Sequence, residues 1–185
     1  MTTIAASLAS LAMAGDSRVT FYKDEVATHA TLCYKLWRTR KYIVGAAGLD
    51  DDISAFKRYL ETPNPGPWRR VSRKKEEFSA ILLSRTSLFA VDNDGAIARC
   101  KYPFHAIGSG AICALSAMNT MARMGVDIDV RMAVEIAIDH DNESGGPVDV
   151  EVWKPIQRRS KPAFTTEKPH GESVQGNGKG SAANG

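Results

Sequence analysis

The alternation of apolar and polar positions divides the chain into short strand-like segments and three helix-like segments. The strand-like segments are runs of β-branched and other apolar residues bounded by Gly, Asn, Asp or Ser, at 19–22, 42–47, 79–83, 87–91, 96–101 and 148–153. The run from Tyr42 to Ala47 contains no charged residue, which predicts a strand buried on both faces. Asp92-Asn93-Asp94-Gly95 predicts a hairpin turn between two of the strands.

The helix-like segments repeat apolar residues every three or four positions. In the first, Ile53, Phe56 and Leu60 form one apolar face, Asp50 to Asp52 supply N-cap candidates, and the proline-rich stretch from residue 63 ends the helix. The second follows Gly108-Ser109-Gly110 and closes at Gly125. The third runs over 130–138, with Asp127 or Asp129 as its cap.

The order of these elements predicts the fold class. The second and third helices follow one another without a strand between them, which excludes a simple βαβ alternation. We therefore expect an α+β domain over residues 2–156, with helices packed on mainly antiparallel sheets. From residue 157 onward Gly, Ser, Asn and Lys dominate without apolar periodicity, which predicts a disordered basic tail over 157–185.

Composition and charge narrow the class of protein. Hydrophobic residues make up 43% of the chain and charged residues 24%, as in soluble globular proteins, and no apolar run reaches the roughly 18 residues of a membrane span. The net charge of +3 comes from the tail, so the neutral body favours neither nucleic acid nor membrane as a partner. Three cysteines without a CxxC pair favour reduced thiols and a cytoplasmic location, and argue against a zinc site.

Candidate chemistry begins at the N-terminus. Removal of Met1 before the small residue Thr2 would leave a hydroxyl and an α-amine on one residue, which is one way to activate a threonine nucleophile. The same segment could be a secretory signal, with Ala12-Met13-Ala14 as a cleavage site. The absence of Lys and Arg before Arg18 disfavours that alternative. The sequence has no GxSxG, Walker, HExxH or dinucleotide motif.

A set of motifs in order resembles proteasome β-type subunits and HslV peptidase. The motifs span most of residues 2–153 and are Thr2-Thr3-Ile4, the run Ala14 to Thr20 around Gly15-Asp16, Lys35, Gly45-Ala46-Ala47-Gly48, Ala106-Ile107-Gly108-Ser109-Gly110, and Asp141 to Gly146. The resemblance implies the four-layer αββα sandwich of N-terminal nucleophile (Ntn) hydrolases. Only one short helix lies between Gly48 and Ser79, so the first helical layer is shortened.

The resemblance also implies roles for individual residues. Thr2 Oγ would attack a peptide carbonyl, and Lys35, held by Asp16, would keep positive charge beside it. The backbone N–H of Gly45 would form the oxyanion hole. Three further side chains would bind the α-amine and order water: Ser109, Asp141 and Ser144.

A cation site and partners follow from the same resemblance. Backbone carbonyls of Ile138, Asp141 and Ser144 would hold a monovalent or divalent cation, and no other cofactor is required. The implied substrate is a peptide or unfolded protein, and the implied partners are copies of the chain in a homo-oligomer and an AAA+ unfoldase. The shortened helical layer makes a closed double ring doubtful.

Two questions stay open at the level of sequence. The segment from Thr2 to Asp16 is two residues shorter than in HslV, and the next segment is about three longer, so Lys23 and Lys41 compete with Lys35. The leading hypothesis is a threonine-type endopeptidase. The alternatives are a catalytically silent assembly subunit and an Ntn amidase that acts on a small molecule.

Overall fold

One antiparallel sheet, called here the small-residue sheet, has two central strands rich in alanine and other small residues. The computed structural model describes residues 2–23, 26–63, 65–68 and 78–154. The strands of this sheet run in the order β10-β1-β2-β11. They are β1 (Thr3–Ser7), β2 (Ala12–Asp16), β10 (Phe104–Gly108) and β11 (Val148–Val152).

The second sheet is richer in large apolar side chains and follows chain order. Its strands are β5 (Leu36–Arg38), β6 (Ile43–Ala47), β7 (Ser79–Leu83), β8 (Leu88–Val91) and β9 (Ile97–Arg99), each antiparallel to the next. A separate two-stranded ribbon pairs β3 (Arg18–Lys23) with β4 (Val26–Leu32).

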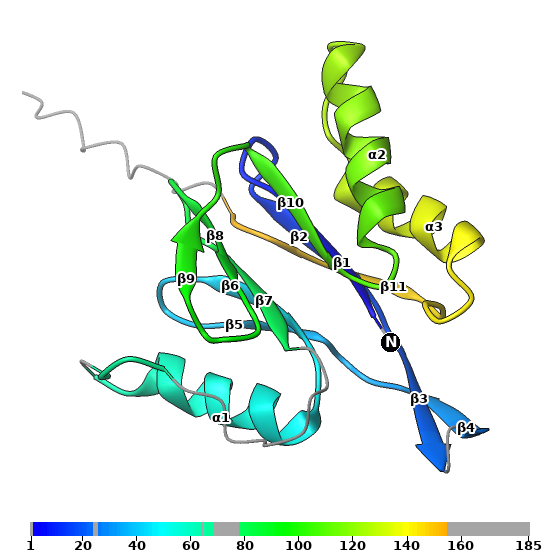
Figure 1. The fold of residues 1–185 in the computed structure, drawn as a ribbon. Coiled ribbons are helices and arrows are strands. Elements are labelled where there is room, and N and C mark those ends of the chain that lie inside the picture. Colours follow the sequence, from blue (N-terminus) through cyan, green and yellow to red (C-terminus); the bar gives the residue numbers. More distant parts are fainter. Residues whose placement is uncertain (1, 24–25, 64, 69–77, 155–185) are drawn as a thin grey trace, which may run out of the picture. The chain divides into compact units, whose positions relative to one another are not determined.

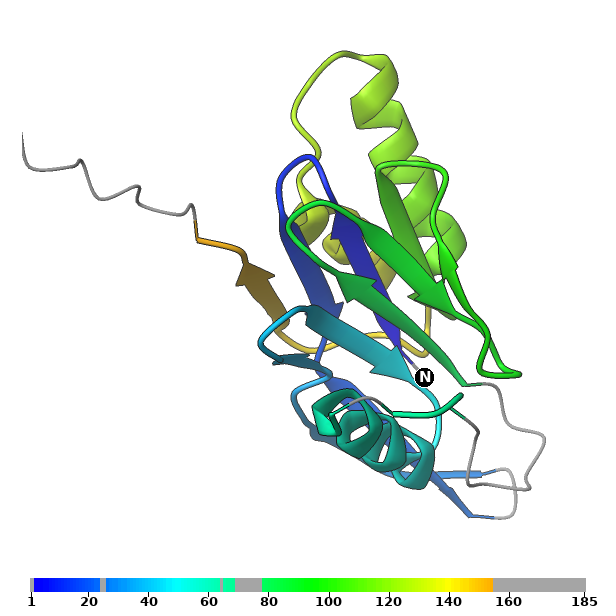
Figure 2. The same ribbon diagram turned by 90° about the vertical axis from the view of Figure 1, so that its left-hand side faces the viewer.

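Helices cover the outer faces of both sheets, so the architecture has four layers (Figure 1 and Figure 2). Helices α2 (Ala111–Arg123) and α3 (Val130–His140) pack on the small-residue sheet, and α1 (Asp50–Glu61) packs on the other. Three apolar clusters correspond to the three interfaces. Alternate residues of β1 show this: Ala5 belongs to the cluster under α2 and α3, whereas Ile4 and Ala6 belong to the cluster between the sheets.

The structure confirms the α+β class, the αββα layering and most of the predicted elements. The strand over 79–83 has the predicted bounds, β6 is buried along nearly its whole length, and the two consecutive helices follow Gly110 and Asp129. The Asp129 side chain accepts hydrogen bonds from Arg131 N and Met132 N, which confirms it as a cap. The cap prediction for α1 is wrong: its N-cap is Leu49, and Asp50 to Asp52 lie inside the first turn, where carboxylates favour the helix dipole.

The short connection between β1 and β2 closes through an unusual backbone conformation. Leu11 has φ +51°, the sole positive φ recorded for a non-glycine residue in the described part of the chain. The left-handed conformation costs a leucine about 1–2 kcal/mol. The Trp153 N–H donates to the Leu11 carbonyl at 2.9 Å, which anchors this turn to the end of β11.

Some predictions fall outside the described residues. They are the disordered tail over 157–185 and most of the basic cluster 68–75, of which only Trp68 is described. The described segments contain no helix long and apolar enough to cross a membrane.

Candidate active site

Asp16, at the end of β2, joins three separate parts of the chain. Its side chain is fully buried, and Oδ1 accepts hydrogen bonds from the Thr3 backbone N–H at 2.7 Å and from Lys35 Nζ at 3.0 Å. The other oxygen, Oδ2, accepts the Gly145 N–H at 3.1 Å. Three donors therefore satisfy both oxygens of this buried carboxylate. It fixes Lys35 beside the peptide bond between Thr2 and Thr3.

Lys35 lies just before β5, and its side chain is 5% exposed. Nζ also donates to the Arg18 carbonyl at 2.5 Å. Burial lowers the pKa of Lys35 from its ordinary value, and the charge of Asp16 opposes that change. The structure therefore brings Lys35 to Asp16, whereas the competitor Lys41 is exposed in the turn between β5 and β6. The other competitor, Lys23, ends β3, and its side chain lies outside the described part.

Thr2 is held at the start of β1 between β2 and β10. It is 9% exposed, and Thr3 pairs with Gly108 in the ladder. A Cβ at Gly108 would overlap the Thr2 carbonyl oxygen, and its φ of +91° also favours glycine. Since side chains alternate along a strand, Thr2 belongs to the same face of β1 as Ile4, the face between the sheets.

The predicted amine-binding side chains form a hydroxyl–carboxylate network on the opposite face of β1. Asp141 Oδ2 accepts the Ser109 hydroxyl at 2.5 Å and the Ser144 hydroxyl at 2.6 Å. Thr3 Oγ1 lies 2.6 Å from Ser144 Oγ. Because the Ser144 proton points to Asp141, Thr3 is the donor in that contact. The structure thus joins all three predicted residues and links them to Thr3, the residue next to the proposed nucleophile.

Asp141 is charged in this network. Burial acts to raise its pKa, but the hydrogen bonds from Ser109, Ser144 and the Glu143 N–H outweigh burial and lower the pKa below its ordinary value. A carboxylate that stays ionised keeps both serine hydroxyls oriented toward it. The lone pairs of those hydroxyls then remain available as acceptors for neighbouring donors.

Gly45 is the first glycine of its motif and is buried. It lies within β6, in register with Leu36 on one side and Ile81 on the other. A Cβ there would lie 2.7 Å from Ile4 Cγ2 and 2.9 Å from Met13 Sδ, so the missing side chain serves packing between the sheets. Gly45 is therefore a buried core glycine, and the oxyanion role that the resemblance implied stays a prediction.

Gly48 is the glycine of the same motif at the end of the strand. It follows β6, is exposed, and has φ +139°, a conformation that other residues rarely adopt. N–H groups alternate in direction along a strand, and the Ala46 N–H donates to the Lys35 carbonyl at 3.4 Å. Gly48 comes two residues after Ala46, so by this alternation its N–H points to the same side of β6 as the Ala46 N–H. That side is the one on which Lys35 lies, and Gly48 lies beyond the start of β5. The direction of this N–H could not be inferred from the motif alone.

The predicted cation carbonyls lie at the end of α3 and in the loop after it. The Asp141 carbonyl accepts the Ser144 N–H at 3.3 Å, while Ile138 lies in the last turn of α3, where carbonyls lack helical partners. Carbonyl oxygens are among the ligands that hard cations take, and the cation site stays a prediction. Among the described residues there is no cluster of three or more His, Cys, Asp or Glu side chains that could hold a metal.

Solved structures share this architecture. HslV from Trypanosoma brucei aligns with a TM-score of 0.66 and 26% identity, over 81% of this chain and 98% of that chain. BPH from Thiobacillus denitrificans, solved in complex with epoxomicin, aligns with a TM-score of 0.63 and 18% identity, over 83% and 100% of the two chains. Anbu from Hyphomicrobium aligns with a TM-score of 0.57 and 15% identity, over 83% and 82%. The chain has the HslV-like, proteasome-type Ntn-hydrolase fold. Neither protein-family models nor curated protein sequences match the sequence.

Proposed function

We propose that this chain is a threonine-type endopeptidase that hydrolyses peptide bonds with Thr2 after removal of Met1. The observation that carries the proposal is the contact set of Asp16. A single buried carboxylate oxygen binds both Lys35 Nζ and the N–H of the Thr2–Thr3 peptide, so the ammonium group is held next to the peptide bond that follows the proposed nucleophile. The HslV-like fold supports it.

In the acylation step, the Thr2 hydroxyl gives its proton to the α-amine, directly or through water, and Oγ bonds to the substrate carbonyl carbon. The tetrahedral intermediate collapses, the C–N bond breaks, and the leaving amine takes the proton. Water then hydrolyses the resulting ester and restores Thr2. Nucleophile and base come from one residue, so the reaction needs no organic cofactor.

Lys35 acts electrostatically in this scheme. Its ammonium group favours negative charge developing on Thr2 Oγ, and Asp16 holds it in place from the buried side. Burial matters because charges interact more strongly where water is excluded. Lys35 contacts the reacting oxygen in the proposal, whereas Asp16 is a positioning residue.

The oxyanion donor in the proposal is the Gly48 N–H rather than that of Gly45. Gly48 directly follows β6, and by the alternation of N–H groups its N–H points to the side of the strand on which Lys35 lies. This glycine has no side chain to obstruct a substrate. Removal of such a donor typically costs about 10²–10³ in turnover. The network of Ser109, Asp141 and Ser144 would accept the amine N–H groups and order the water used in both steps.

The proposal extends to partners. The substrate in the proposal is a peptide or an unfolded segment, as the HslV-like fold suggests. A homo-oligomer in the cytoplasm and an AAA+ unfoldase partner follow from the HslV-like fold as proposals.

Hydrolysis of a panel of fluorogenic peptides tests the proposal. We expect Thr2→Ala to lower turnover by about 1000-fold or more, because the nucleophile is lost, and Thr2→Ser to retain measurable activity. Thr3→Ser, one residue further on, keeps its hydroxyl and serves as the matched control. Hydrolysis by Thr2→Ala at the wild-type rate would contradict the proposal and indicate a nucleophile elsewhere, whereas no hydrolysis by the wild-type chain would favour a silent subunit.

The two glycines give a second, independent test. Gly48→Ala should reduce turnover, with strain of about 1–3 kcal/mol at a positive φ. Gly45→Ala overpacks the core, so its effect should appear as a loss of unfolding free energy of about 1–3 kcal/mol. Turnover per folded molecule, measured with urea unfolding, separates the two. A catalytic defect confined to Gly45→Ala would restore the original assignment.

A further inference from the structure

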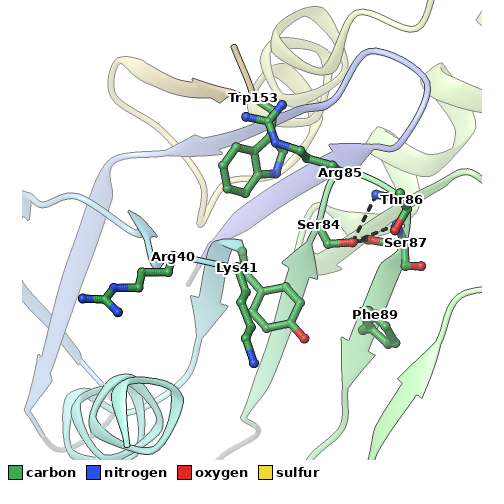
Figure 3. A pocket seen from close by; sticks show the side chains of 9 residues that line it. Arg40, Lys41, Ser84, Arg85, Thr86, Ser87, Phe89 and Trp153 are labelled. Carbon is green, nitrogen blue, oxygen red and sulfur yellow. Dashed lines mark hydrogen bonds between the residues drawn. The ribbon is translucent and has the colours of Figure 1, made fainter. Parts of the chain in front are cut away.

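A pocket of about 410 Å³ lies at the opposite end of the strands from the candidate active site. Two turns form its sides: residues 39–42 between β5 and β6, and residues 84–87 between β7 and β8. Lys35 precedes β5, whereas the first of these turns follows it. Trp153, just after β11, completes the lining (Figure 3).

The charged residues that line this pocket are all basic. They are Arg40, Lys41 and Arg85. In the described part of the chain, none of the three forms an ion pair, and Glu151 on β11 pairs with Arg38 instead. Residues 1–156 have no net charge. Three basic residues around one pocket of a neutral body favour a local positive potential, which attracts anions.

The pocket is also held in shape. Arg85 donates to the Lys154 carbonyl at 2.8 Å, and its guanidinium lies 4.6 Å from the centre of the Trp153 ring. Trp153 Nε1 donates to the Leu83 carbonyl at 3.0 Å. Figure 3 shows the Ser84 hydroxyl bonded within its own turn, to Thr86 N and Ser87 N. Side chains fixed in this way lose little entropy when a ligand binds.

Aromatic rings give the pocket an apolar component. Tyr42 and Phe89 line it together with Trp153, and the rings of Tyr42 and Phe89 pack edge to face at 6.2 Å. Arginine and aromatic residues are enriched where proteins bind other proteins. A site that combines them suits a ligand with both carboxylates and apolar side chains.

We propose that this pocket, the Arg85 pocket, binds a short acidic peptide segment of a partner protein. Guanidinium groups bind carboxylates through paired hydrogen bonds, and the rings accept a neighbouring apolar side chain. Inorganic phosphate has no apolar group that could contact the aromatic rings. The chain's own segment after Lys154 is not complementary in charge, because five basic residues there stand against two acidic ones. The proposal does not depend on Thr2.

Fluorescence anisotropy of the full chain tests it with two labelled hexapeptides, Asp-Glu-Leu-Asp-Glu-Leu and its Asn/Gln counterpart. We expect the acidic peptide to bind at least about tenfold more tightly than the neutral one, and less tightly as salt rises. The double variant Arg40→Glu/Lys41→Glu should weaken acidic-peptide binding by about tenfold or more. The matched control, Lys101→Glu/Arg123→Glu, makes the same charge change at exposed sites outside the pocket and should change binding less than about twofold.

Four outcomes would overturn the proposal. The first two are equal binding of the two peptides and unchanged acidic-peptide binding in the double variant. The others are stronger binding of a dT oligonucleotide or inorganic phosphate than of the acidic peptide, and a double variant in which only self-association changes. The same titration in Thr2→Ala removes cleavage of the probe. Unchanged binding there would separate this proposal from the peptidase proposal. An unchanged melting temperature of the double variant shows that the fold is intact.

Discussion

Two ion pairs connect the sheets at opposite ends of β5, and they differ in exposure. Lys35, just before β5, pairs with Asp16 of β2 at 3.0 Å, with side chains 5% and 0% exposed. Arg38, the last residue of β5, pairs with Glu151 of β11 at 2.5 Å, with side chains 37% and 40% exposed. The same strand therefore carries one pair inside the protein and one at its surface.

The difference in exposure suggests different roles. Removing two charges from water is unfavourable, and a buried pair often stabilises a protein no better than an apolar pair of similar size. An exposed pair costs little to form and contributes about 0–1 kcal/mol. Stability alone gives no reason for a buried pair beside the start of β1, whereas the proposed peptidase function supplies one. The comparison can be tested by breaking each pair.

The largest effect is expected from Lys35→Met. It leaves the Asp16 carboxylate buried without its cation, which should cost about 3–5 kcal/mol of unfolding free energy and abolish peptide hydrolysis. The double variant Asp16→Asn/Lys35→Met should recover much of the stability and none of the activity. Urea unfolding measures the first quantity. A loss below about 1 kcal/mol for Lys35→Met would show that the pair behaves like a surface pair.

Ser144→Ala tests the network on the other face of β1. The Thr3 hydroxyl, which is fully buried, loses its acceptor, and we expect a loss of about 1–3 kcal/mol. Ser109→Ala removes a hydroxyl from the same carboxylate at an exposed position, so it should cost less than about 1 kcal/mol. Equal losses for the two serines, again from urea unfolding, would mean that burial does not govern this network.

Glu151→Gln tests the exposed pair. Its loss should stay below about 1 kcal/mol and should disappear in 1 M salt, where surface charges are screened. The Arg38 guanidinium also lies 5.0 Å from the centre of the Trp153 ring. A substitution at Arg38 would therefore remove this contact as well as the ion pair, whereas a substitution at Glu151 removes only the ion pair. A salt-independent loss would show that this pair is effectively buried.

The smallest expected effect is the pH dependence that Lys35 contributes. Burial holds the pKa of Lys35 below 10.5 in the folded chain. Between the folded and unfolded pKa values the unfolded chain binds more protons, so wild-type stability should rise with pH relative to Lys35→Met. Activity should instead fall as pH rises through the folded pKa, because the neutral amine no longer favours an oxyanion. Parallel pH profiles for both proteins would show that Lys35 does not titrate there.

Elements with strong local signals could be predicted from the sequence. Helix α3 has a side-chain cap at Asp129 and a clear apolar period, and β7 is a run of apolar residues. Strand β5 was missed because it has only three residues, and β10 because it runs into the Gly108-Ser109-Gly110 motif. Short segments gain their structure from neighbours rather than from propensity.

Only part of the candidate site could be predicted from the sequence. Order along the chain identified Asp16 and Lys35, although their contact spans 19 positions. The choice between Gly45 and Gly48 as the oxyanion donor depends on which way the N–H of each points, in β6 and just after it, and a four-residue motif does not contain that information. The link from Ser144 to Thr3 spans 141 positions and comes from the packing of α3 against the small-residue sheet.

Intact mass spectrometry after incubation with epoxomicin, the compound bound to the structurally similar BPH, tests the central claim most directly. The account predicts a wild-type chain that lacks Met1 and carries one adduct, which peptide mapping places on Thr2. Thr2→Ala and Lys35→Met should remain unmodified. A wild-type chain that retains Met1, or an adduct that persists in Thr2→Ala, would contradict the claim that Thr2 is the nucleophile.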